Sequence, residues 1–109
     1  MAKGEFLGEF EQLVLLALMH LGDQAYGMTV RQEISKRTGR DVSIGAVYAT
    51  LSRLEEKGYI SSKLSEPTSE RGGKAKRFFE VSASGVRALR HSQLALRQMM
   101  NGLPARLLN

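Results

Sequence analysis

Residues 43–58 constrain the fold of this chain more than any other stretch, because they mark both ends and both faces of one helix. Apolar side chains recur there at intervals of three and four residues, which is the spacing of a helix that buries one face. These side chains are Ile44, Val47, Leu51 and Leu54. Ser43 is placed to cap the start of the helix, and Gly58 is placed to end it.

The opposite face of this predicted helix carries little bulk near its start, where Gly45, Ala46 and Ala49 lie. Hydrogen atoms and methyl groups anchor another protein poorly, but they let a helix come close to the floor of the DNA major groove. A surface helix that carries small residues by chance has the same periodicity. The neighbouring segments favour a recognition helix.

The overall composition limits the classes that remain. A length of 109 residues allows one domain with a modest core, and a net charge of +5 favours an anionic partner, nucleic acid before a membrane. The absence of cysteine excludes disulfides and thiolate chemistry. No apolar run approaches the ~20 residues that span a bilayer, and the acidic start predicts no signal peptide. We therefore expect a cytoplasmic protein without membrane contact.

Two helices are predicted before the recognition helix, after a loosely held segment over residues 1–8. The first runs from Glu9 to about Leu21 and is apolar over most of its circumference, which predicts partial cover by a second subunit. Its main apolar stripe is Phe10, Leu13, Val14, Ala17, Leu18 and Leu21, and further apolar surface comes from Leu15, Leu16 and Met19. The second helix runs from Met28 to Arg37, after a turn over residues 23–27.

After Gly58 the hydrophobic period changes from that of a helix to that of a strand. Residues 59–65 and 76–81 predict two strands, and the proline and glycines between them can continue neither, so a β-hairpin, or wing, is expected over residues 60–81. Its basic residues are Arg71, Lys74, Lys76 and Arg77. Such a run is usually a solvated face, but beside a candidate recognition helix it predicts phosphate contacts, which set affinity and register.

Ser82 is a candidate cap for a last helix from Ala83 to about Leu103. Its seam, spaced by three and four, is Val86, Leu89, Gln93, Leu96, Met100 and Leu103. The seam either packs on the chain's own first helix or forms a homodimer interface together with Leu15, Leu16 and Met19. We favour the homodimer, which would place two recognition helices in successive major grooves of a palindromic site.

The predicted fold class is therefore mainly α with a small β-hairpin (α+β). It consists of a winged helix-turn-helix over residues 1–82 and a dimerisation helix over residues 83–109. From about Gly8 to Leu89 the chain resembles the short form of the PadR family of transcriptional regulators. The matching motifs are Tyr26-Gly27, residues 43–60, Arg71-Gly72-Gly73-Lys74, Lys76-Arg77-Phe78-Phe79 and residues 81–85.

The resemblance implies a dimeric repressor that binds operator DNA through its third helix and wing. In some members a small aromatic or drug-like molecule binds near the dimer interface and releases the DNA. This chain has no tryptophan, so a ligand pocket built on stacked tryptophans is not available to it. Two departures are Phe78-Phe79, where tyrosines are common, and Ser82, where threonine is usual.

Roles on the recognition helix follow from the helical wheel. Gly45, Ala46 and Ala49 are expected on the groove side, with specificity from thymine methyl groups and DNA shape. Ser43 and Tyr48 are expected to donate hydrogen bonds to phosphates, although Tyr48 could instead be half-buried at the helix edge. Thr50 is expected to contact a phosphate or a base edge, and Arg53 a phosphate. Residues 55–56, both glutamates, either face away from DNA or are neutralised by Arg53 and Lys57.

An enzyme is not expected. His20 and His91 are the only histidines, and the chain has no cysteine, P-loop or nucleophile elbow, so neither a metal nor a cofactor is predicted. The alternative function is a winged-helix protein-interaction adaptor that never meets DNA. A steep salt dependence of binding to duplex DNA would distinguish the two, because neutralised phosphates release counterions.

Overall fold

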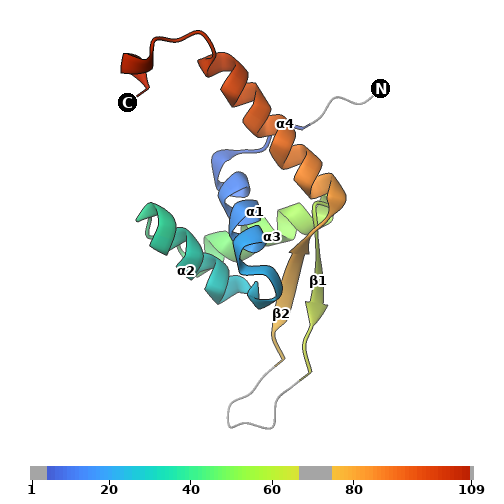
Figure 1. The fold of residues 1–109 in the computed structure, drawn as a ribbon. Helices are drawn as coiled ribbons and strands as arrows, with labels where there is room; N and C mark the ends of the chain where they lie inside the picture. Colours follow the sequence, from blue (N-terminus) through green and yellow to red (C-terminus); the bar gives the residue numbers. More distant parts are fainter. Residues whose placement is uncertain (1–4, 67–74, 109) are drawn as a thin grey trace.

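The computed structural model describes residues 5–66 and 75–108. Three helices come first, followed by two strands, a long helix and a short 3-10 turn (Figure 1). They are α1 (Glu9–Leu21), a 3-10 turn at Gly22–Gln24, α2 (Gly27–Thr38), α3 (Ile44–Glu56), β1 (Ile60–Leu64), β2 (Arg77–Val81), α4 (Ala83–Met100) and a 3-10 turn at Ala105–Leu107. This is the predicted α+β architecture, a winged helix-turn-helix with a C-terminal helix.

The core lies where α1, α2 and α3 meet the base of the hairpin (Figure 1). Val47, Leu51 and Leu54 of α3 are buried there, as the apolar period predicts. Leu15 of α1 is fully buried as well, so the prediction that it adds outer surface is wrong. The apolar stripe of α1 is wider than the helical wheel suggested, because both α3 and the hairpin pack on this helix.

The caps and stops predicted for the helices are confirmed. Ser43 Oγ accepts a hydrogen bond from the N–H of Ala46 at 3.0 Å, and Ser82 Oγ accepts one from the N–H of Gly85 at 3.1 Å. Gly58 has a φ of +79°, a left-handed conformation that favours glycine. These local devices explain why the boundaries of α3 follow so closely from the sequence.

The two strands form an antiparallel hairpin in which Ile60 pairs with Val81 and Leu64 pairs with Arg77. A third segment extends the sheet, because the N–H of Phe79 donates to the carbonyl of Ala25 at 2.8 Å. The face of β1 that carries Ile60, Ser62 and Leu64 is covered only at its helix-facing end: Ile60 is buried, whereas Leu64 is 56% exposed. The hairpin therefore projects from the helices toward the side opposite α4 (Figure 1).

Helix α4 is shorter than predicted, since it ends at Met100 and not at Leu103. Gly102 has a φ of +92° and Pro104 cannot donate to a helical hydrogen bond, so the chain turns there. The first half of α4 packs on its own chain, where Ala88, Leu89 and Ser92 are buried. Ser92 Oγ also accepts a hydrogen bond from the N–H of Leu7 at 2.9 Å, so residues 5–8 are held rather than loose.

Candidate nucleic-acid interface

The first turns of α3 present a slim surface on the side opposite the core. Gly45, Ala46 and Ala49 are exposed, and nothing in the described residues stands within 4 Å of the position that a Cβ on Gly45 would take. Ser43 uses its hydroxyl oxygen to cap the helix, which leaves the hydroxyl hydrogen free to donate. The structure thus brings these four residues together on open surface, and their contact with DNA stays a prediction.

Tyr48 lies at the edge of this surface with 47% of its area exposed. Its ring packs against Gly27, the first residue of α2. The side chain is half-buried at the helix edge, which was one of its two interpretations, and it still has exposed area to offer a phosphate.

Thr50 is not available to DNA, because it is only 2% exposed. The prediction that it contacts a phosphate or a base edge is therefore wrong. Its hydroxyl oxygen instead accepts a hydrogen bond from Nη2 of Arg53 at 3.1 Å. The sequence did contain a signal, since Val47, Thr50 and Leu54 share the three-and-four spacing of the buried face.

The cations at the end of α3 pair with acidic residues from the start of the chain. Arg53 Nε lies 3.9 Å from Glu11 Oε2, and Lys57 Nζ lies 2.6 Å from Glu5 Oε2 and 3.1 Å from Glu11 Oε2. Within the described residues, Arg53 and Lys57 therefore pair with Glu5 and Glu11, and not with Glu55 or Glu56. Arg53 keeps about half of its side chain exposed (52%), which leaves it able to reach a phosphate.

Glu5 joins the two ends of this cluster. Its carboxylate accepts hydrogen bonds from Lys57 and, at 2.8 Å, from the hydroxyl of Tyr59. The hydrogen bond from Lys57 is the main reason why the pKa of Glu5 is lowered, and the same contact raises the pKa of Lys57. Sequence analysis missed this cluster because its partners lie more than 40 positions apart, beyond the reach of any local pattern.

At the start of β2, on the loop side of the hairpin, Lys76 and Arg77 are both exposed. Lys76 Nζ lies 4.4 Å from the centroid of the Tyr26 ring, a cation–π contact. Arg77 Nη1 donates to Ser62 Oγ at 2.9 Å. The charged end of each side chain is thus held by a contact within the chain. Arg71 and Lys74, the other two predicted phosphate ligands of the wing, lie outside the described residues.

The predicted dimer surface divides into two groups. Leu15 and Leu89 are buried in the chain's own core, so they have no surface to offer a second chain, and this part of the prediction is wrong. The remaining residues are partly or well exposed: Leu16, Met19, Val86, Gln93, Leu96, Met100 and Leu103. Leu16 and Leu96 also line an apolar groove of about 460 Å³ between α1 and α4.

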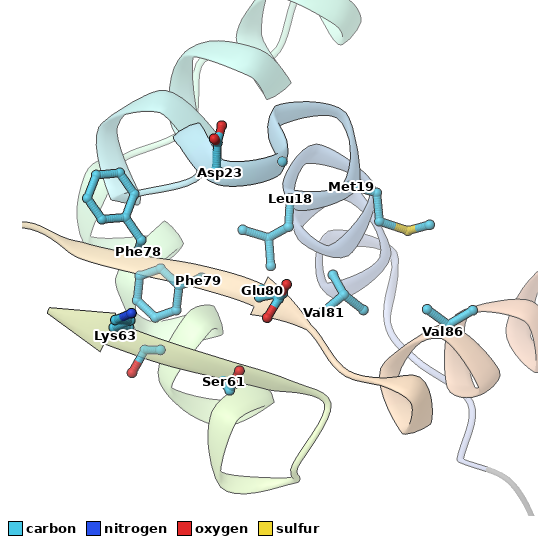
Figure 2. A pocket seen from close by; sticks show the side chains of 12 residues that line it. Leu18, Met19, Asp23, Ser61, Lys63, Phe78, Phe79, Glu80, Val81 and Val86 are labelled. Atoms are coloured by element: carbon cyan, nitrogen blue, oxygen red, sulfur yellow. The ribbon is translucent and has the colours of Figure 1, made fainter. Parts of the chain in front are cut away.

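A larger open groove of about 860 Å³ lies between the outer face of the hairpin, the end of α1 and the start of α4. In Figure 2, Met19, Val81 and Val86 lie at one end of this groove, and Phe78 and Lys63 lie at the other. Met19 and Val86 belong to the predicted dimer surface, so this groove would border a second protomer.

Two further structural features bear on function. Within residues 5–66 and 75–108, no helix is both long and apolar enough to cross a membrane. In the same residues, no group of three or more His, Cys, Asp and Glu side chains could hold a metal ion.

The comparison with protein families gives a match over residues 15–91 to the transcriptional regulator PadR-like family. The chain belongs to this family. It is therefore a DNA-binding transcriptional regulator and not an enzyme, as the resemblance implied. No curated protein matches the chain.

Solved structures share the fold of this PadR-like chain. A PadR family transcription regulator from Clostridium difficile R20291 has a TM-score of 0.70 at 21% identity and covers 94% of this chain and 100% of its own. A PadR family regulator from Eggerthella lenta has a TM-score of 0.68 at 24% identity, and the match covers 93% of this chain and 87% of that regulator. The Orc1 protein of Aeropyrum pernix, solved in complex with DNA, has a TM-score of 0.63 at 22% identity, and the match covers 84% of this chain and 26% of Orc1.

Proposed function

We propose that this PadR-like regulator is a repressor that binds a palindromic operator as a homodimer. In this proposal α3 enters the major groove, and the wing over residues 60–81 holds the flanking phosphates. The observation that carries it is the two-sided character of α3. On its inner face Val47, Leu51 and Leu54 are buried in the core. On its outer face Gly45, Ala46 and Ala49 are exposed and carry almost no side-chain bulk.

The charges around this face support the same role. Arg53 of α3 and Lys76 and Arg77 of the wing are all exposed, and we infer that they lie where they can reach the phosphates on either side of the slim face. Arg53 is anchored by Thr50 and Arg77 by Ser62, which reduces the rotamer entropy that each long side chain loses on binding a phosphate. Phosphate contacts of this kind supply affinity and register, and sequence choice then falls to the slim face.

Dimerisation is proposed through the helix in residues 83–109. Leu96 is 58% exposed and, together with Leu16, it borders the groove between α1 and α4. A second copy of α4 lying there would cover apolar surface on both chains, as a two-fold interface requires. A small-molecule effector near this interface stays part of the proposal, and the groove in Figure 2, bordered by Met19 and Val86, is where we would seek it.

The decisive experiment places a carboxylate on the slim face. Ala46→Glu should abolish binding to operator DNA selected with the pure protein, because the new charge would meet phosphates and fill the close approach. Ala83→Glu makes the same change at an exposed alanine of α4 and should leave affinity within about twofold. Both variants should remain folded by circular dichroism.

Normal operator affinity of the Ala46→Glu variant would show that α3 does not lie in the major groove. Binding of the unaltered protein to duplex DNA should also fall steeply as salt rises from 50 to 200 mM, by ~10³-fold or more for six or more phosphate contacts. The absence of such a slope would favour the protein-interaction adaptor instead. Selection of a palindromic sequence would establish two-fold binding.

A further inference from the structure

Gly27, the first residue of α2, has no room for a side chain. A Cβ built on it would lie 2.3 Å from Cζ of Tyr48, 2.4 Å from its Oη and 2.8 Å from its Cε1. Non-bonded carbon atoms attract best at about 3.5–4.0 Å, so these positions overlap. The ring of Tyr48 therefore occupies the space that any other residue at position 27 would need.

The backbone gives no separate reason for glycine at this position. Positive φ values occur at Gly22, Gly39, Gly58 and Gly102 but not at Gly27. Gly27 stands at the first position of α2 without a positive φ, so the backbone of α2 alone does not require glycine there. The contact with Tyr48 is the feature of the structure that leaves room for glycine only.

We propose that Gly27 is a positioning residue for DNA binding, because its missing side chain lets the Tyr48 ring rest on the start of α2 and so fixes where the Tyr48 hydroxyl meets a phosphate. This inference rests on the proposed function and adds a residue that does not itself touch DNA. The hydroxyl oxygen is among the atoms closest to the position of the missing Cβ, so even a methyl group would move it. Hydrogen bonds depend steeply on distance and angle, and a displaced hydroxyl would lose the contact.

The neighbouring residue ties the same point to the wing. The Tyr26 ring meets Phe78 edge-on, with centroids 5.5 Å apart, and carries Lys76 Nζ 4.4 Å from its centroid. Tyr26 and Gly27 thus connect the start of α2 to one cation of the wing and one hydroxyl of α3. Tyr26 and Gly27 thus hold Lys76 and Tyr48, two residues proposed to bind phosphates, against the start of α2.

The first test is the variant Gly27→Ala. Because the crowded atoms are the far end of a flexible side chain, the Tyr48 ring can swing out and the fold should survive, with a melting temperature equal to or above that of the unaltered protein. Affinity for operator DNA should fall about tenfold, and Tyr48→Phe, which keeps the ring but lacks the hydroxyl, should show a similar loss. The nuclear Overhauser contact between the Tyr48 ring and the Gly27 Hα atoms should be strong in the unaltered protein, and the ring should lose its contact with residue 27 in the variant.

The second test combines the two changes. In a Tyr48→Phe background, Gly27→Ala should cause no further loss of affinity, because no hydroxyl is left to displace. An equal loss in both backgrounds, or no loss in the single variant, would overturn the positioning role. Failure of the unaltered protein to bind any duplex would instead contradict the proposed function, so the two failures are distinguishable.

Discussion

A buried threonine and an exposed arginine act as a pair on α3. Thr50 Oγ1 accepts a hydrogen bond from Arg53 Nη2, and Glu11 Oε2 lies 3.9 Å from Nε of the same guanidinium. A free arginine loses much rotamer entropy when it binds a phosphate, and an arginine that is already held loses less. In the proposed complex, Thr50 would contribute to DNA binding from within the core, through the orientation of Arg53.

Replacement of this hydroxyl by a methyl group tests the pair. Thr50→Val should change the free energy of unfolding by no more than about 1 kcal/mol, since Arg53 can turn to water when its neutral acceptor is lost. Operator affinity, measured by fluorescence anisotropy, should fall three- to tenfold. In an Arg53→Ala background the same change should have no effect, and a larger loss than that of Arg53→Ala alone would assign Thr50 a role of its own.

At the scale of elements, the start of α4 is bound to the junction between α3 and β1. The hydroxyls of Ser82 and Ser84 donate to the carbonyl of Gly58 at 2.7 and 2.8 Å, and the N–H of Ser82 donates to the carbonyl of Tyr59 at 2.9 Å. The direction of α4 is therefore set relative to the recognition helix. In a dimer built on α4, this joint would fix the distance between the two recognition helices.

Gly85 makes this close approach possible, and its replacement should be costly. A Cβ at this position would stand 2.2 Å from the carbonyl oxygen of Tyr59, a backbone atom that cannot swing away. Gly85→Ala should lower the free energy of unfolding by about 1–3 kcal/mol in urea titrations. Gly45→Ala, which meets open space, should be neutral or stabilising by up to about 1 kcal/mol. Equal effects of the two changes would refute the joint.

The wing is tested by removing its two described cations, Lys76 and Arg77, at the loop end of its strands. Lys76→Ala with Arg77→Ala should weaken binding to operator and random DNA alike. The slope of log affinity against log salt should shrink by up to about four for a dimer that loses four phosphate contacts. Arg87→Ala with Arg90→Ala removes the same charge from exposed positions of α4 and should leave the slope unchanged. An unchanged salt slope in the wing variant would show that Lys76 and Arg77 do not contact phosphates.

At the scale of the whole molecule, α4 exposes apolar surface beyond its packed first half. Leu94, Leu96, Met99 and Met100 are exposed along this helix, and Leu103, Leu107 and Leu108 are exposed after it. Apolar groups gathered in this way usually mark an interface. The helix lies at the opposite end of the molecule from the wing (Figure 1), so a second chain could cover it without blocking α3.

Dimerisation through this surface predicts that Leu96→Lys yields a monomer in sedimentation experiments, because the variant would bury an unpaired charge in the interface. Leu64→Lys, at a leucine of similar exposure (56% against 58%) on the wing, should remain a dimer. A monomeric Leu96→Lys protein should also bind operator half-sites more weakly than the dimer binds the whole operator. Persistence of the dimer would mean that α4 meets its partner elsewhere or not at all.

The order of elements and most of their ends were predictable, and individual side chains were less so. Ser43, Gly58 and Ser82 mark helix ends through contacts within a few residues, so sequence alone locates them. Leu15 was assigned to an outer surface because a helical wheel shows angle but not which neighbour arrives at that angle. Thr50 was assigned to the outer face although its spacing from Val47 and Leu54 groups it with the buried side chains. Residues 71 and 74 of the wing lie outside the described residues, and their roles stay predictions.

Caps, stops and hydrophobic period act over short distances along the chain, so the sequence alone located most of the helix and strand ends. Packing in three dimensions settles which side chains of α3 enter the core and which stay on its exposed face. Glu5 meets Lys57, Gly27 makes room for Tyr48, and Gly85 rests on Tyr59 through contacts between segments that folding alone brings together. Such contacts depend on packing in three dimensions, and no local pattern of residues records them.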